Sequence, residues 1–165
     1  TSSTDICYGQ WVDAGGNIFA VGVTEGTISG NKNFGSQDGW VLKLDRDGNL
    51  QWATQVGTSG EDGLAKVTTN SAGQVIVGGV SKGDLTNVVS VGGLDAVLFV
   101  LDADGREVGK RMFGTAASDG VNGIAVTESQ EILVAGTTGS GILGTVGLGE
   151  LDVFVARFKP LSGGK

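Results

Sequence analysis

The chain has 165 residues, of which 31 are glycine and none is histidine, and 39% are hydrophobic. This length suits one domain or a short repeat array rather than a multidomain enzyme, and the lack of histidine excludes His-based triads and His-ligated metals. The net charge of -7 repels phosphate backbones, and the sequence has no apolar run long enough for a membrane span, so we expect neither a nucleic-acid partner nor membrane insertion.

A period of 57 residues organises the chain. The segment that begins at Asp38 recurs at Asp95 and again at Asp152, with no insertion or deletion between the copies. Three full units need 171 positions, so the third copy is six residues short. Fixed-period repeats indicate stacked supersecondary units. We therefore interpret residues 1–165 as a single repeat array whose last unit is incomplete.

Each unit predicts four short strands, which are clearest in the second copy. There we expect strands at Leu64–Thr69, Val75–Val80, Ala96–Leu101 and Val108–Phe113. The first connection of each unit is a tight turn, at Asp13–Gly16, Asn70–Gly73 and Thr127–Gln130. The middle connection is longer, at Thr24–Gln37, Ser81–Leu94 and Thr138–Leu151. Asp-x-Asp-Gly turns form the last connection of the first two units, because glycine accepts positive φ there. No segment has a helical period, so the pattern indicates antiparallel meanders.

Four strands per unit are typical of a β-propeller blade. The second strand of each unit carries small residues around Gly22, Gly79 and Gly136, as expected where strands crowd a central axis. A β-trefoil also has four strands per unit and closes with three units. The predicted fold is all-β, with three blades of four antiparallel strands forming a partial propeller or half of a six-bladed ring. A β-trefoil-like fold is the alternative.

The string from Gly35 to Trp52, followed by Gln55-Val56-Gly57, resembles the β-propeller repeat family named after seven-bladed propellers. That repeat typically reads G-x-x-D-A-F-V-A-K-x-D-x-x-G-N-x-x-W. Residues 16–24 and 119–127 are similar to its later segments. The chain departs from the pattern in two places. Gly109 occupies the position of Trp52, and Lys159–Ser162 replaces the Asp-x-x-Gly turn in the third copy.

The resemblance implies a propeller scaffold but no particular reaction. Members of this family are mostly secreted or on the cell surface, which implies an extracellular or other non-cytosolic location. Propellers close with about four to eight blades, so three blades leave two sheet faces bare. Soluble monomers rarely expose apolar patches of that size. We therefore expect a protein partner, a second copy or further repeats of a longer polypeptide to complete the ring.

Two acidic patterns are candidate ligand sites. The turns Asp45–Gly48 and Asp102–Gly105 resemble the start of a calcium loop, but neither continues to the Glu that such a loop needs. We interpret them as hairpin turns and predict no metal site. Asp38, Asp95 and Asp152 each precede an apolar strand. We expect their carboxylates to accept hydrogen bonds from backbone amides of the adjoining loop rather than to bind a ligand.

No set of residues predicts catalysis. Glu61 and Asp62 are adjacent, so their side chains point to different sides and do not form a facing acid–base pair. Thr1 is a formal nucleophile, but no nearby group supports that role. The glycines of residues 26–35 do not follow a strand and open a helix, which excludes a phosphate-binding loop. We expect no enzymatic activity, no catalytic residue and no cofactor.

Single aromatic and cysteine residues give further expectations. Trp40, whose equivalents are apolar, is predicted to pack between blades. Trp11 and Trp52 lie at positions that do not repeat, so they form no repeated sugar-stacking platform, and we expect them to be exposed. The neighbours of Cys7 predict that it is buried as a small apolar side chain.

The predicted function is a non-catalytic β-propeller scaffold or protein-interaction module, as a subunit or fragment of a larger assembly. The alternative is a carbohydrate-binding, lectin-like propeller that gains avidity from repeated weak sites. Loops on a rigid frame carry recognition in such folds, so any ligand is expected at the three middle connections. The sequence identifies no individual ligand-binding residue.

Overall fold

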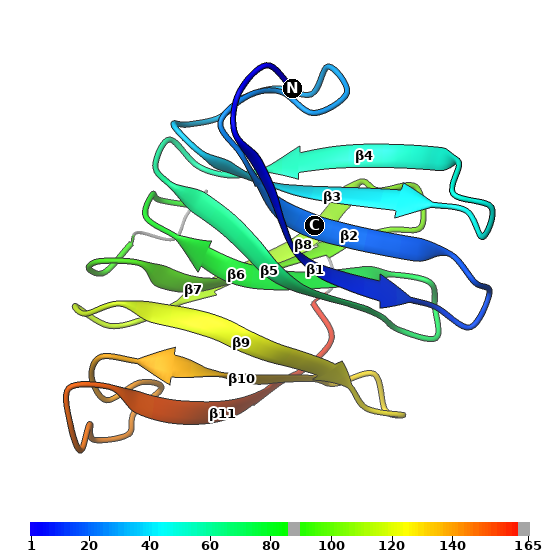
Figure 1. Ribbon diagram of the computed structural model, residues 1–165. Helices are drawn as coiled ribbons and strands as arrows, with labels where there is room; N and C mark the ends of the chain where they lie inside the picture. The colour runs from blue at the N-terminus through cyan, green and yellow to red at the C-terminus, as the bar shows by residue number, and fades with distance from the viewer. Residues whose placement is uncertain (86–89, 162–165) are drawn as a thin grey trace.

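A computed structural model describes residues 1–85 and 90–161, which form eleven strands in three antiparallel sheets (Figure 1). Sheet 1 contains β1 (Asp5–Val12), β2 (Ile18–Thr24), β3 (Asp38–Leu44) and β4 (Leu50–Val56). Sheet 2 contains β5 (Asp62–Thr69), β6 (Val75–Ser81), β7 (Asp95–Leu101) and β8 (Glu107–Phe113). Sheet 3 contains β9 (Asp119–Val126), β10 (Ile132–Thr138) and β11 (Asp152–Phe158). The described residues contain no helix, so the all-β prediction is confirmed, and no helix there is able to cross a lipid bilayer.

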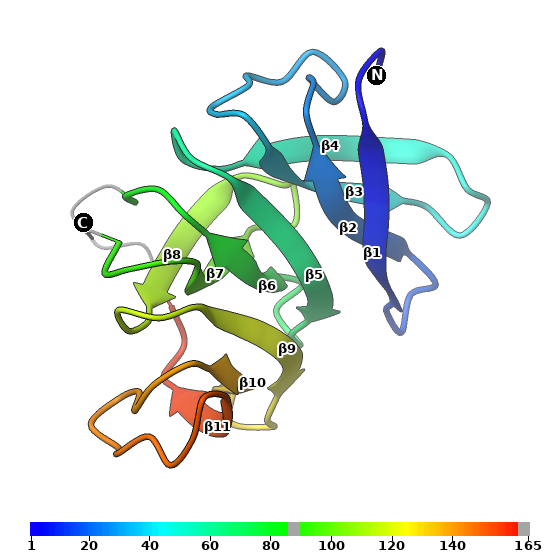
Figure 2. The same cartoon turned by 60° about the vertical axis from the view of Figure 1, so that its left-hand side comes forward.

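Each sheet is a meander in which consecutive strands pair, and each sheet corresponds to one 57-residue unit. The first strands, β1, β5 and β9, lie side by side, and the other strands fan outward from them (Figure 2). Successive sheets are joined by the same backbone hydrogen bond. The Asp62 amide donates to the Gln37 carbonyl at 2.8 Å, and the Asp119 amide donates to the Leu94 carbonyl at 2.6 Å. The sheet-to-sheet step therefore repeats along the chain.

The tight turns share one hydrogen-bond pattern. Asp45 Oδ1 accepts the amides of Asp47 and Asn49, both at 2.9 Å, and Gly48 adopts a φ of 86°. The corresponding positions of the other tight turns behave in the same way, with side-chain oxygens of Asp13, Asn70, Asp102 and Thr127 as acceptors. These local bonds mimic a backbone turn and set the length of each hairpin. The predicted strands of the second copy consequently agree with the structure to within two residues.

Each inner strand contains a β-bulge at the same repeat position. The register of the β1–β2 pair skips Tyr8, that of β5–β6 skips Ala65, and that of β9–β10 skips Asn122. Glycine is required on the paired strand, because a Cβ on Gly22 would collide with the Ile6 carbonyl oxygen of β1. The small residues of the second strand thus reflect the close approach of its inner neighbour.

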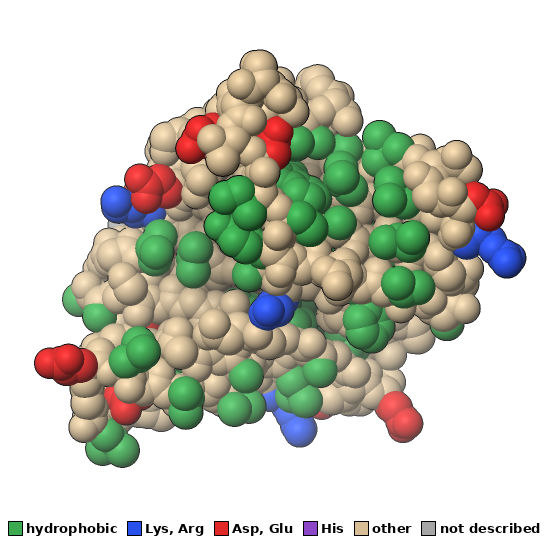
Figure 3. Space-filling model, in the orientation of Figure 1, with side chains coloured by type: hydrophobic (Ala, Val, Ile, Leu, Met, Phe, Trp, Pro, Cys, Tyr) green, Lys and Arg blue, Asp and Glu red, His purple; other side chains and the backbone are tan. Residues whose placement is uncertain are grey.

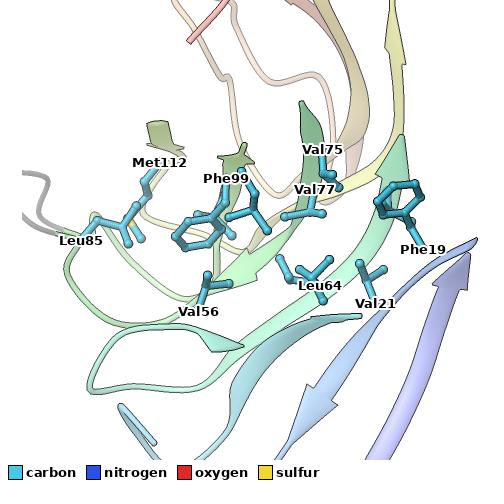
Figure 4. Close-up of a cluster of buried hydrophobic side chains, with 13 residues drawn as sticks. Phe19, Val21, Val56, Leu64, Val75, Val77, Leu85, Phe99 and Met112 are labelled. Carbon is cyan, nitrogen blue, oxygen red and sulfur yellow. The ribbon is translucent and has the colours of Figure 1, made fainter. Parts of the chain in front are cut away.

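Apolar side chains fill the two spaces between the sheets. Phe19, Val21 and Val56 of sheet 1 pack against Leu64 and Phe99 of sheet 2 (Figure 4). A second cluster lies between sheets 2 and 3. β7 has a sheet on each side, and all seven of its residues are buried. This burial on both faces explains why β7 is a continuous apolar run rather than an alternating one.

The tryptophans follow the predictions in part. Trp40 is 6% exposed and donates from Nε1 to the Val23 carbonyl at 2.8 Å, but it belongs to neither apolar cluster between the sheets, so it is buried without the predicted packing between blades. Trp11 is 41% exposed, as expected. Trp52 is half-buried instead of exposed, because its ring packs on Phe19 and its Nε1 donates to the Ala103 carbonyl of sheet 2 at 3.0 Å.

The prediction that Cys7 is buried is wrong, since the side chain is exposed. Its repeat equivalents, Leu64 and Val121, are 1% and 3% exposed. The difference has a simple cause. Leu64 and Val121 point toward a preceding sheet, whereas no sheet of the described chain precedes β1.

Candidate functional site

A cavity of about 490 Å³ opens beside the inner strands. Residues from all three units line it at shared repeat positions, among them the sets Tyr8/Ala65/Asn122, Gln37/Leu94/Leu151 and Val23/Val80/Thr137. The first set consists of the bulged residues of β1, β5 and β9, and bulges redirect side chains in this way. The fold thus brings equivalent backbone positions to one cavity, while the sequence gives each position a different side chain.

The cavity carries polar and aromatic groups of ordinary surface chemistry. Tyr8 is 54% exposed beside it, and Thr137 Oγ1 donates to Asn122 Oδ1 at 3.2 Å. Glu61 lies at its rim and forms a long ion pair with Lys82, at 3.7 Å. These groups offer a ring face, hydroxyls, an amide and a carboxylate. Groups of this kind are able to hydrogen-bond and stack against a ligand.

Asp62 and Asp119, at the starts of β5 and β9, border the cavity, but their carboxylates already accept hydrogen bonds from within the fold. Asp62 Oδ2 accepts the amide of Thr58 at 2.6 Å and its hydroxyl at 2.8 Å. Thr115 donates to Asp119 in the same way, at 2.6 and 3.0 Å. Burial raises the pKa of Asp62, although the hydrogen bonds from Ser81 and Thr58 act in the opposite direction.

The first unit repeats this threonine–aspartate pair at the N-terminus. The Thr1 ammonium donates to Asp5 Oδ2 at 2.7 Å, and the Thr1 hydroxyl donates to the same atom at 2.8 Å. Hydrogen bonds from the ammonium, from Thr24 and from the Thr1 hydroxyl lower the pKa of Asp5 to about 2. Our sequence reasoning considered Thr1 only as a nucleophile. The threonines at 57-residue spacing were the available signal for its structural role.

Asp38, Asp95 and Asp152 begin β3, β7 and β11, and they accept the expected backbone hydrogen bonds. Asp38 accepts the amide of Phe34 at 2.8 Å, and Gln55 Nε2 also donates to it, at 2.7 Å. Asp95 and Asp152 accept the equivalent loop amides, from Val91 at 2.9 Å and from Leu148 at 2.8 Å. These carboxylates therefore hold the end of each middle connection against the following strand.

The Asp-x-Asp-Gly turns use their first carboxylate in the turn itself. Asp45 accepts the amide bonds described above, and the side chain of Asn49 lowers its pKa. In the second unit, Arg106 pairs with Asp104 at 2.5 Å and with Asp102 at 3.7 Å. Within the described ranges, no group of three or more acidic or cysteine side chains is placed to hold a metal ion.

The middle connections differ in how firmly they are held. The first one docks on sheet 1, because the Ile28 amide donates to Gln55 Oε1 at 3.0 Å and Asn31 Nδ2 donates to the Ala53 carbonyl at 3.1 Å. The third exposes Val146 by 83% and Leu148 by 91%. Part of the second connection, residues 86–89, lies outside the described residues, as does Ser162 of the segment that replaces the repeat turn in the third unit.

The outer face of sheet 3 is uncovered. Val153 and Val155 of β11 are 85% and 80% exposed, whereas their equivalents in β7, Ala96 and Leu98, are fully buried. On β11 the buried residues alternate with exposed ones, so one face of this strand packs on sheet 2 and the other meets solvent. Apolar residues on this face are normally covered in a soluble protein.

The outer face of sheet 1 is also apolar and only partly covered. Ile18, Ala20 and Leu42 are half-buried, while their equivalents in sheet 2 are fully buried: Val75, Val77 and Phe99. Apolar side chains gather over β1–β3 on the face shown in Figure 3, and others follow β11 below. Sequence reasoning anticipated two bare faces, and the structure identifies the residues on them.

Comparison with known proteins gives one partial relative. No protein-family model matches the chain. Over 113 residues, 64% of its length, the chain is 35% identical to the regulatory protein FlaEY of Caulobacter vibrioides. The match covers 12% of that protein. The match therefore covers more than half of the chain but only a small part of FlaEY, which is much longer.

Proposed function

We propose that the chain is part of a β-propeller of the repeat family named after seven-bladed propellers, and that it acts as a non-catalytic protein-interaction scaffold. The 57-residue period, the four-stranded meanders and the adjacent inner strands support this fold. A β-trefoil is less compatible with separate sheets that stack face to face through two apolar clusters.

The contrast between Val155 and Leu98 carries the functional proposal. The two residues occupy the same repeat position, yet Val155 is 80% exposed and Leu98 is fully buried under sheet 3. In open repeat arrays, the terminal units carry a polar outer face that acts as a cap. The outer face of β11 carries valines instead. The scaffold therefore binds a partner β-sheet at this face.

The partial match is compatible with an interaction role. FlaEY is named a regulatory protein, and the matched part is 12% of it. A repeat module within a long regulatory protein suits a binding function. The cavity between the inner strands has no nucleophile–base pair among its described lining residues, which also favours binding over catalysis.

Sedimentation velocity over a range of protein concentrations tests the proposal. The unmodified chain should associate, and Val155→Asp should weaken association at least tenfold while leaving the circular dichroism spectrum unchanged. Val91→Asp is the matched control, because it places the same charge at an exposed loop residue of the second unit, away from β11. Equal association of the two variants would contradict the proposal, as would a chain that stays monomeric at every concentration.

The cavity favours carbohydrate binding as a second function. Tyr8 offers an exposed ring for stacking, and Gln37, Asn122 and Thr137 offer the amides and hydroxyls that hydrogen-bond sugar hydroxyls. A glycan array with the unmodified chain and with Tyr8→Ala tests this role. Binding that is lost in the variant supports it, and an array without binding contradicts it.

A further inference from the structure

We propose that the partner at the bare face of sheet 3 is a second copy of the chain, bound through the outer face of its sheet 1. This inference rests on the proposed function and names the occupant of the face. Cys7 of one copy then lies against Val153 of the other, and two such contacts close a ring of six sheets.

The contacts between neighbouring sheets predict this pairing. Leu64 of sheet 2 lies directly on Gly39 of sheet 1, since a Cβ on Gly39 would come within 2.6 Å of Leu64 Cγ. One unit later, Val121 and Ala96 belong to the same buried cluster between sheets 2 and 3. Cys7 occupies the repeat position of Leu64 and Val121, and Val153 occupies the position of Gly39 and Ala96. At the equivalent contact between two copies, Cys7 of one copy therefore lies on Val153 of the other.

A backbone hydrogen bond follows the same series. The amides of Asp62 and Asp119 donate to the carbonyls of Gln37 and Leu94 in the preceding sheets. The equivalent donor at the start of the chain is the Asp5 amide, and the equivalent acceptor at the end of the series is the Leu151 carbonyl. A second copy docked in this register brings these two groups together.

The two bare faces are complementary in chemistry because they are the two halves of one repeated junction. Sheet 3 presents Leu133, Ala135, Val153 and Val155, which correspond to the sheet 2 residues that sheet 3 covers. Sheet 1 presents Cys7, Ile18, Ala20 and Leu42, which correspond to the sheet 2 residues that cover sheet 1. One molecule thus carries both partners of the contact, and the head-to-tail arrangement closes if two copies complete the rotation.

Cysteine cross-linking tests the register directly, because Cys7 is the single cysteine of the chain. Val153→Cys adds a second thiol at an 85% exposed position, where folding does not depend on the side chain. At the equivalent internal pair, a Cβ on Gly39 would lie 2.6 Å from Leu64 Cγ, the place that a cysteine sulfur would take, so this position is close enough for a disulfide. With oxidised glutathione as oxidant, the Val153→Cys chain should therefore shift to twice the monomer mass under non-reducing conditions.

Two control variants make this result specific. The double variant Cys7→Ser/Val153→Cys lacks one of the two thiols, so tryptic mass spectrometry should find a disulfide between the peptides that contain positions 7 and 153 only in the single variant Val153→Cys. Ser129→Cys puts an exposed thiol in the turn between β9 and β10 and should give no more cross-linked dimer than the unmodified chain.

The outcomes separate this inference from the proposed function. If Val155→Asp weakens association but the Val153→Cys chain forms no disulfide between positions 7 and 153, the face binds a partner in another arrangement, and only the inference fails. If the cross-linked products extend to trimers and larger species, the closed pair is wrong. If the chain does not associate at all, both proposals fail together.

Discussion

Asp38 and Asp62 face each other across Gly57. A Cβ added to Gly57 would collide with Asp38 Oδ1 and lie 3.1 Å from Asp62 Oδ2, so both carboxylates border the same small space. Both side chains are buried, and within the described part of the chain Oδ1 of each has no hydrogen-bond partner. Asp95 and Asp119 repeat the arrangement across Gly114. Each junction between sheets thus holds two buried carboxyl groups, and no ion pair of the described residues involves either one.

This pairing predicts how stability depends on pH. Burial, together with the nearby Asp38, raises the pKa of Asp62 above its ordinary value of 3.8. A raised carboxyl pKa in the folded state favours folding at low pH, and that contribution is lost as the pH rises through the folded-state pKa. Asp62→Asn cannot ionise. The unfolding free energy of the natural chain should therefore fall relative to that of the variant as the pH rises above about 4, as measured by urea unfolding.

Asp5 provides the opposite case as a control. Its pKa is lowered to about 2, so its stabilising contribution is present above its ordinary value of 3.8 and is lost as the pH falls toward 2. The stability of the natural chain relative to Asp5→Asn should therefore rise with pH in this range. The same sign of pH dependence for both variants would contradict the assignment.

Gly57 has no room for a side chain. Gly57→Ala places a methyl group against the Asp38 carboxylate, and overpacking of this kind costs about 1–3 kcal/mol. Gly149→Ala is the control, because a Cβ there meets no atom within 4 Å. Chemical unfolding should show a loss for Gly57→Ala and little change for Gly149→Ala. Equal effects would show that the carboxyl pair does not constrain the junction.

Two leucines separate core packing from surface exposure. Leu98 is fully buried between sheets 2 and 3, so Leu98→Ala should lower the unfolding free energy by about 2–5 kcal/mol. Leu148 is 91% exposed, and Leu148→Ala should change it by less than about 0.5 kcal/mol. Urea unfolding of both variants at one protein concentration gives the comparison. A small loss for Leu98→Ala would show that the second apolar cluster is not formed in solution.

The Asp-x-Asp-Gly turn predicts unequal roles for its two acids. Asp45 accepts two backbone amides, so Asp45→Ala should lower the unfolding free energy measurably, whereas Asp47→Ala should have almost no effect. Added calcium should leave the unfolding midpoint of the natural chain unchanged, because the Asp45 carboxylate is already engaged in the turn. A midpoint that rises with calcium, and does not rise in Asp47→Ala, would contradict the interpretation as a simple hairpin turn.

Local features of the fold were predictable from the sequence. The strands next to Asn70–Gly73 and Asp102–Gly105 were placed correctly because the turn chemistry is encoded in four neighbouring residues. The exposure of Cys7 was not predictable in this way. Its environment depends on whether a sheet lies in front of β1, which is a long-range property that the local sequence does not report.

The candidate site was less predictable than the strands. Tyr8, Ala65 and Asn122 share a repeat position, but their side chains have nothing in common, and only the strand register shows that each is a bulge beside the cavity. The pairing of Asp38 with Asp62 was also missed. Both aspartates recur every 57 residues, yet spacing along the chain does not show that two different series meet in space.

The contrast between β7 and β11 bears on how such an array can grow by duplication. A unit inserted in phase would bury the valines of one strand and present the same surface again on the next, so lengthening alone never removes the exposed ends. Both exposed ends are covered at once only if the number of units lets the last sheet pack on the first. In the closed ring proposed above, the two end faces cover each other, so neither terminal unit needs a polar cap.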